Sequence, residues 1–138
     1  MSDPTAANGA RRRTNGWLLH PLERLELLKI YPPRYADVIA HHVTLSSGDP
    51  ASGLPKQTRG TIIGRADDGR GVEALVVAIG DTTHRPSGGT YHITWSLDRA
   101  ANREPRESND VIANFGWEPI QPRRSLELMP ACWERETS

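Results

Sequence analysis

The chain has 138 residues, of which 36% are hydrophobic and 25% are charged, and its 17 basic residues balance 17 acidic ones. This length suits one domain, and this composition is typical of a folded, soluble protein. A net charge of zero gives no general attraction to duplex nucleic acid or to an anionic membrane. No run approaches the roughly 20 apolar residues that span a bilayer, and the N-terminus lacks the apolar core of a secretory signal. We therefore expect a cytoplasmic protein with no membrane partner.

The N-terminal segment and the cysteine content indicate how the chain is organised. Residues 1–16 are mostly small and polar and include the run Arg11-Arg12-Arg13. The sequence predicts a disordered basic tail over 1–16 and a single domain over 17–138. Cys132 is the only cysteine, which excludes an internal disulfide and a cysteine-based zinc cluster.

The first predicted elements are a helix and a strand. Leucines recur at helical spacing over residues 21–30, and a proline at position 21 suits the first turn. Pro32-Pro33 ends the helix, because the residue before a proline favours extended geometry. Residues 38–45 are rich in β-branched side chains and predict a strand. Glycines, prolines and serines predict a loop over residues 46–56.

The middle of the chain predicts a hairpin. Two strand-like runs, 58–66 and 72–80, are separated by Asp67-Asp68-Gly69-Arg70-Gly71, which has typical hairpin turn chemistry. Residues 74–79 are almost continuously apolar, so we expect a central strand that is buried on both faces.

The last third of the chain completes the prediction. Residues 82–89 form a predicted loop, residues 90–97 a strand with strong β formers, and residues 98–107 a charged loop. A short helical turn is expected near residues 108–114, and a last strand over residues 125–132. The predicted class is α+β, with an N-terminal helix packed on a mainly antiparallel sheet of roughly five strands.

Two His-x-Thr tripeptides lie within predicted strands. His42 and Thr44 are two residues apart, so they point to the same face of their strand, and His92 and Thr94 do the same. If the two strands are neighbours, two imidazoles and two hydroxyls meet on one patch of sheet. One imidazole can then act as base and the other as acid, while the hydroxyls hold the oxygens of a phosphate. The alternative is that these are ordinary strand residues.

These motifs carry a family resemblance. The segments Ile39-Ala40-His41-His42-Val43-Thr44-Leu45 and Tyr91-His92-Ile93-Thr94-Trp95-Ser96 resemble the paired motifs of the two-histidine (2H) phosphoesterase superfamily. That superfamily includes bacterial RNA ligase-like proteins, cyclic nucleotide phosphodiesterases and the cyclic phosphodiesterase domain of fungal tRNA ligase. A compact branch near the tRNA ligase domain is indicated by Tyr31-Pro32-Pro33, Pro105 and Ser108-Asn109.

The resemblance, which runs from about residue 17 to residue 133, implies a function. It implies a bilobal sheet whose motif strands line a cleft, and a hydrolase that opens 2′,3′-cyclic phosphates or related bonds in an RNA end or a small cyclic nucleotide. His42 and His92 are then catalytic, Thr44 and Thr94 bind the substrate, and no metal or other cofactor takes part. Two departures are the short chain, which implies a trimmed lobe, and His41, which replaces an apolar residue.

Other side chains have competing interpretations. Alternation along a strand predicts that His41 faces away from His42, and a zinc site from His41, His42, His84 and His92 is the metal alternative. His20 is placed to cap the helix. His84 and Arg85 lie in a loop from which they could approach a phosphate, although a solvated loop explains them as well.

Three functions are consistent with the sequence. The first is the phosphodiesterase, the second is a module that binds a nucleotide or RNA terminus without turnover, and the third is an interaction domain. Intact His and Thr at all four motif positions favour the first. Tyr91 and Trp95 lie on the face opposite His92, where core packing is expected rather than base stacking.

Overall fold

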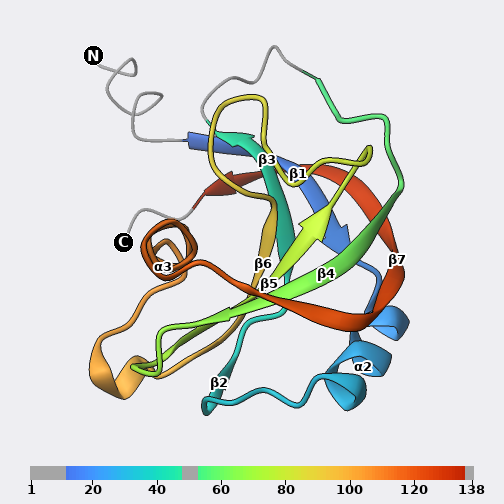
Figure 1. Cartoon of the computed structure of the whole chain (residues 1–138). Helices are drawn as coiled ribbons and strands as arrows, with labels where there is room; N and C mark the ends of the chain where they lie inside the picture. The colour runs from blue at the N-terminus through green and yellow to red at the C-terminus, as the bar shows by residue number, and fades with distance from the viewer. Residues whose placement is uncertain (1–11, 48–52, 136–138) are drawn as a thin grey trace, which may run out of the picture.

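Strands dominate the computed structural model, which describes residues 12–47 and 53–135 (Figure 1). In chain order its elements are β1 (Arg12–Leu19), α2 (Pro21–Ile30), β2 (Asp37–Val38), β3 (His42–Ser47), β4 (Arg59–Asp67), β5 (Val72–Ala78), β6 (His92–Leu97), a 3₁₀ turn (Arg99–Ala101), α3 (Glu107–Phe115) and β7 (Glu118–Arg135). The pairings between these strands are antiparallel. The predicted α+β class and the mainly antiparallel sheet are therefore confirmed.

The sheet closes on itself. Strands β6, β3, β1, β7, β4 and β5 follow one another in that order, and β5 pairs back with β6 to complete a six-stranded barrel. The short strand β2 pairs with the far end of β6. Every strand of the ring has a partner on both sides, so closure leaves the ring without an open edge. The bilobal cleft that the resemblance implies stays a prediction.

Aromatic and branched side chains fill the barrel. Trp17 and Tyr91 meet edge to face, with ring centroids 5.7 Å apart. The indole N–H of Trp17 donates to the Gln57 carbonyl at 2.7 Å, and that of Trp95 donates to the Tyr31 carbonyl at 2.8 Å. Tyr91 and Trp95 belong to the core, as predicted, and every residue of β5 except the last is buried.

Helix α2 has the predicted bounds and packs against this core. Pro21 begins it, and the Nδ1 atom of His20 accepts a hydrogen bond from the Leu22 amide at 3.3 Å, which confirms the predicted cap. Leu27 is fully buried in the barrel core and Leu28 packs on it. The Arg24 Nε donates to the Ala40 carbonyl at 2.8 Å, so the helix also holds the segment that leads into β3.

Helix α3 covers part of the barrel's outer face, on a different side from α2 (Figure 1). Val111 and Ile112 are buried against apolar side chains of β4 and β5, including Ile63 and Val76. The predicted helical turn near residues 108–114 is thus confirmed as α3. Because this helix lies on the outside, side chains that point outward from neighbouring strands can be buried beneath it.

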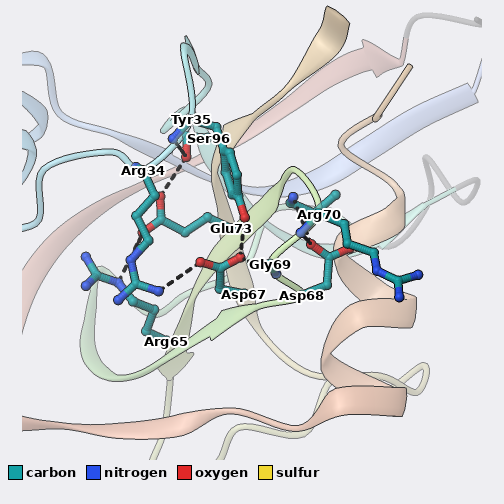
Figure 2. A network of polar contacts seen from close by, with 10 residues as sticks. Arg34, Tyr35, Arg65, Asp67, Asp68, Gly69, Arg70, Glu73 and Ser96 are labelled. Carbon is teal, nitrogen blue, oxygen red and sulfur yellow. Dashed lines mark hydrogen bonds and ion pairs between the residues drawn. The ribbon is translucent and has the colours of Figure 1, made fainter. Parts of the chain in front are cut away.

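A buried carboxylate holds the segment between α2 and β2 (Figure 2). Glu73 on β5 is fully buried, and its Oε1 accepts hydrogen bonds from the Arg34 amide at 3.0 Å and the Ser96 hydroxyl at 2.6 Å. Its Oε2 lies 3.1 Å from Nε of Arg65. One charged group thereby connects a loop, the hairpin and β6.

Asp67 extends this network at the end of β4 (Figure 2). It accepts hydrogen bonds from the Tyr35 hydroxyl at 2.6 Å and from Nη1 of Arg34 at 2.8 Å. Burial acts to raise the pKa of Asp67, but the bonds from Tyr35 and Arg34 outweigh it and lower that pKa. Burial and the bond to Asp67 raise the pKa of Tyr35 to about 12.

Two sequence predictions need correction. The predicted disordered tail over 1–16 is wrong for residues 12–16, which belong to β1; the rest of that tail lies outside the described residues. Strand β1 pairs with both β3 and β7, which satisfies its backbone and buries Thr14 and Asn15 despite their polarity. The predicted last strand is also longer, because β7 begins at Glu118. Residues 48–52 of the predicted loop lie outside the described residues as well.

Candidate active site

The predicted strand over 38–45 is interrupted, and the interruption shapes the candidate site. The Ala40 amide donates to the Thr94 carbonyl at 3.0 Å, yet the next pair between these segments is Val43 with Ile93. Thr94 and Ile93 are consecutive, whereas Ala40 and Val43 are three residues apart. The two histidines between them are therefore a bulge, which Ala40 opens with a left-handed φ of 42°.

The bulge brings both histidines of the first motif together. The prediction that His41 faces away from His42 is wrong: their Nδ1 atoms lie 3.0 Å apart and their ring centroids 5.2 Å apart. Alternation holds only within a regular strand, and His41 precedes β3. Trp133 near the end of β7 contacts both rings edge to face, with centroids 4.9 Å from His42 and 6.3 Å from His41.

Pairing between β3 and β6 centres the two tripeptides on each other. Val43 and Ile93, their neighbouring hydrophobic residues, are paired and fully buried inside the barrel. Thr44 and His92 adjoin this pair and so point to the outer face. On the other side of β3, Gly16 lets β1 approach closely, since a Cβ there would collide with the Val43 carbonyl.

The ring of His92 is fixed in one tautomer. Its Nδ1 lies 2.8 Å from the Thr90 carbonyl, which only accepts, so Nδ1 carries the proton and Nε2 keeps a lone pair. Burial lowers the pKa of His92; the bond to Thr90 acts the other way, and the positive charge of Arg85 adds to the lowering. The neutral imidazole is therefore the resting form at neutral pH, with Nε2 ready to accept a proton.

His42 is also neutral at neutral pH. Burial lowers its pKa to about 4, and the charges of His41 and His92 contribute in the same direction. His92 lies on β6, which pairs with β3 through Val43 and Ile93, so the charge of His92 reaches His42 from the neighbouring strand. Among the described residues, no carboxylate contributes to the pKa shift of either imidazole.

A guanidinium adjoins His92. Arg85 in the loop before β6 donates from Nε to the Gly88 carbonyl at 3.0 Å and from Nη2 to Oδ1 of Asn109 at 3.3 Å. The loop and α3 together line a hollow of about 320 Å³, and its lining includes Arg85, Asn109 and Asp110. Arg85 is half-buried, and burial lowers its pKa from a value so high that it stays charged. Its positive charge acts on the pKa of His92.

The two threonines occupy different environments. The hydroxyl of Thr94 lies 2.9 Å from the Ser108 hydroxyl and donates to the Pro105 carbonyl at 3.3 Å, and both Thr94 and Ser108 are buried. Thr94 therefore fastens α3 to β6 and is not free to hold a phosphate. Thr44 is half-buried, and its hydroxyl has no hydrogen-bond partner among the described residues.

The remaining candidates are less connected. His84 is exposed in its loop, where its amide donates to the Thr82 hydroxyl at 3.0 Å. Among residues 12–47 and 53–135, no group of three or more His, Cys, Asp or Glu is arranged to hold a metal ion. In the same residues no helix is long and apolar enough to cross a bilayer.

Sequence reasoning missed two members of the site. Trp133 comes from the other end of the chain, and it reaches His42 because β7 and β3 both pair with β1. His41 lies in the bulge beside His42, which regular strand alternation does not predict. Comparisons with protein-family models, with curated proteins and with solved structures give no match.

Proposed function

We propose that the protein is a phosphodiesterase that opens a cyclic phosphate, in an RNA end or a small cyclic nucleotide, by acid–base catalysis between His42 and His92 without a metal. The observation that carries the proposal is the Val43–Ile93 pair, which centres the two His-x-Thr tripeptides on each other across β3 and β6. Membership of the 2H superfamily, a substrate cleft beside the motif strands and a cytoplasmic location are parts of this proposal.

His92 is the better placed general base. Its Nε2 has a lone pair because Nδ1 is held by Thr90, so it can take a proton from a water molecule that attacks phosphorus. The opposite imidazole, His42, then gives a proton to the leaving oxygen. Thr44 replaces the predicted pair of threonines as the hydroxyl that holds a phosphate oxygen, since Thr94 is engaged with Ser108.

Charge supports binding of a phosphodiester. Two neutral imidazoles and the Arg85 guanidinium present no negative charge to the bound phosphate. A phosphodiester anion between the rings favours the imidazolium form of either one, because an opposite charge nearby raises a histidine pKa. Substrate binding therefore promotes the proton arrangement that the reaction needs, in which one ring is protonated and the other is neutral.

The test is a panel of 2′,3′- and 3′,5′-cyclic nucleotides and an RNA oligonucleotide with a 2′,3′-cyclic end, assayed with a chelator and with product analysis. We expect at least one of these compounds to be opened to a single phosphomonoester in the presence of the chelator. If the chelator abolishes activity and added zinc or manganese restores it, the protein is a metal-dependent hydrolase instead.

The binding module is the second candidate, and a specific observation favours it. One of the two motif threonines, Thr94, is already engaged with Ser108, which leaves a single threonine hydroxyl for the phosphate. The same panel separates the two functions when calorimetry accompanies it. A cyclic nucleotide that binds with saturation, but is recovered unchanged, identifies the binding module.

A further inference from the structure

We propose that His41 is a proton relay for His42: its exposed ring takes a proton from water and passes it from Nδ1 to Nδ1 of His42, while His42 releases a proton from Nε2 to the leaving oxygen. This inference rests on the proposed phosphodiesterase function and adds a third histidine to it. The role belongs to a residue that neither tripeptide includes.

The contact between the two rings has the geometry of a relay. Their Nδ1 atoms are 3.0 Å apart, which is hydrogen-bond distance, and one of the two must carry the proton that they share. His41 is exposed, whereas His42 is partly buried. Trp133 touches both rings and limits their rotation. The bulge therefore places a solvent-accessible imidazole directly behind a partly buried one.

The tautomers follow from this bond. When Nδ1–H of His41 donates, Nδ1 of His42 accepts, and the proton of neutral His42 is then on Nε2. This is the reverse of His92, where Nδ1–H donates to the Thr90 carbonyl and Nε2 is bare. The two motif histidines thus offer the substrate one N–H donor and one lone pair, and the N–H acts as an acid when His41 supplies a proton to Nδ1 of the same ring.

The proton count balances in this scheme. Before the step, His41 is an imidazolium and His42 is neutral with its proton on Nε2. The Nδ1–H bond of His41 breaks and an Nδ1–H bond forms on His42, while the Nε2–H bond of His42 breaks and an O–H bond forms on the leaving oxygen. Afterwards His41 and His42 are neutral, and His92 holds the proton of the attacking water. The cycle closes when His92 releases that proton to solvent, Nε2 of His42 takes up a proton from solvent after the product leaves, and the Nδ1 proton of His42 returns to Nδ1 of His41.

Burial is the reason that His42 needs such a partner. With its pKa at about 4, only about one molecule in a thousand holds His42 as its own imidazolium at pH 7. The titratable groups that act on it are His41 and His92, and Arg85 acts on His92. Through the relay, the proton is carried by the exposed ring and enters the buried site only as it is used.

Three variants separate a relay from a merely structural role. In His41→Gln, the side-chain amide can still donate to Nδ1 of His42 but cannot pass a proton, and His41→Ala does neither. We expect kcat for the best compound of the panel to fall by about 10–100-fold in both, and the pH optimum to move to lower pH. Added imidazole should restore His41→Ala. The matched control is His84→Ala, an exposed histidine in a loop, with activity equal to wild type.

The outcomes are distinct. A His41→Gln variant as active as wild type would show that His41 only positions His42, and an unaffected His41→Ala would remove any role. A folded His41→Ala that imidazole fails to restore would also overturn the relay. If the wild-type protein opens none of the cyclic phosphates, the proposed function fails, and the relay fails with it.

Side-chain ¹⁵N spectroscopy tests the hydrogen bond independently of activity. At pH 7 we expect His42 to be protonated on Nε2 and His92 on Nδ1, and we expect the His42 signals, but not those of His92, to change in His41→Ala. A wild-type His42 with its proton on Nδ1 would reverse the direction of the bond and overturn the relay, even where the phosphodiesterase activity is present.

Discussion

Strand β6 contributes to two polar clusters, His92 near its start and Ser96 near its end. At the Ser96 end, Glu73 accepts hydrogen bonds from the Arg34 amide and the Ser96 hydroxyl and forms an ion pair with Arg65 (Figure 2). At the His92 end, His42 and His92 are groups of the same kind whose charged forms repel each other. One strand thus supports a cluster of opposite charges and a cluster of like groups.

The difference indicates what each cluster is for. Opposite charges with several hydrogen bonds hold elements of the fold together, although one buried pair is itself weak evidence of net stability. A lowered pKa means that the charged form of a buried imidazole does not stabilise the fold. Groups with such perturbed pKa values gather at functional sites. The comparison therefore predicts that substitutions at the first cluster impair folding and substitutions at the second impair activity.

The largest effect is expected at the imidazoles. His42→Ala and His92→Ala each remove one proton-transfer partner, which is worth about 10²–10⁴-fold in rate. Because the pair acts as a unit, the double variant should be little worse than the poorer single one. Steady-state rates on the best compound of the panel, with circular dichroism to check folding, measure this. Multiplicative losses in the double variant would show that the two rings act independently.

Glu73→Ala should give the largest loss of stability. Removing one partner of a buried ion pair leaves uncompensated charge and costs about 3–5 kcal/mol. Urea unfolding measures the free energy of unfolding, and Glu73→Gln is the matched variant, because it keeps an acceptor for Ser96 and should lose less. Folded Glu73→Gln should retain the wild-type rate. A clearly lower rate in folded Glu73→Gln would show that the Glu73 cluster also contributes to activity.

The stability of the imidazole cluster depends on pH. The pKa of His42 is about 4 in the folded protein and about 6.5 in an unfolded chain, so below pH 6.5 the unfolded state takes up the proton first. Stability is therefore constant above pH 6.5 and falls as the pH decreases from 6.5 towards 4, by on the order of 2–3 kcal/mol. His92 adds to this fall, since burial lowers its pKa as well.

Urea titrations at a series of pH values between 7 and 4 measure this fall for the wild-type protein and for His42→Gln, which cannot take up the proton. We expect the wild-type protein to lose more stability than the variant over this range. If the free energy of unfolding falls equally with pH in both proteins, the pKa of His42 is not lowered by burial.

Local patterns were sufficient for the elements whose neighbours are close in sequence. The helix Pro21–Ile30 and the hairpin strands β4 and β5 follow from periodicity and from turn residues within a few positions. Alternation also predicts that Thr44 and His92 each point away from their buried neighbours, and the pairing of Val43 with Ile93 places them on one face. Strand β1 could not be predicted, because the burial of Thr14 and Asn15 is possible only after pairing with β3 and β7.

The candidate site was predictable only in part, for a related reason. His42 and His92 can be identified from the sequence, but the bulge at His41 depends on the pairing of β3 with β1 and β6. The engagement of Thr94 depends on where α3 packs, and Ser108, its partner, is 14 residues away. Trp133 reaches His42 only because β1 pairs with β3 on one side and with β7 on the other. Tertiary contacts, rather than strand propensity, decide which motif residues stay available.

The two motif threonines lie in different environments, so their substitutions should have different effects. Thr44→Ala removes a hydrogen bond to a charged phosphate, worth about 1.5–3 kcal/mol, so kcat/KM should fall by about 10–150-fold with stability preserved. Thr94→Val leaves the buried Ser108 hydroxyl without its partner and should cost about 1–3 kcal/mol in the free energy of unfolding. Rates and urea unfolding on both variants check this. Similar losses of activity without a loss of stability would show that the threonines are equivalent after all.

The smallest effect is expected at the aromatic edge of the site. Trp133 is partly exposed beside His42 and offers a surface on which a nucleobase can stack, and such a contact is worth about 1–3 kcal/mol. Trp133→Ala should therefore raise KM for a cyclic nucleotide by about 5–150-fold and change kcat little, because the contact is made equally before and during the reaction. Trp133→Phe should restore most of the affinity. The matched control is Trp117→Phe, since Trp117 is also partly exposed but packs against Gly64 on β4. A fall in kcat with KM unchanged in Trp133→Ala would mean that the indole positions the His41 and His42 rings and does not bind the base.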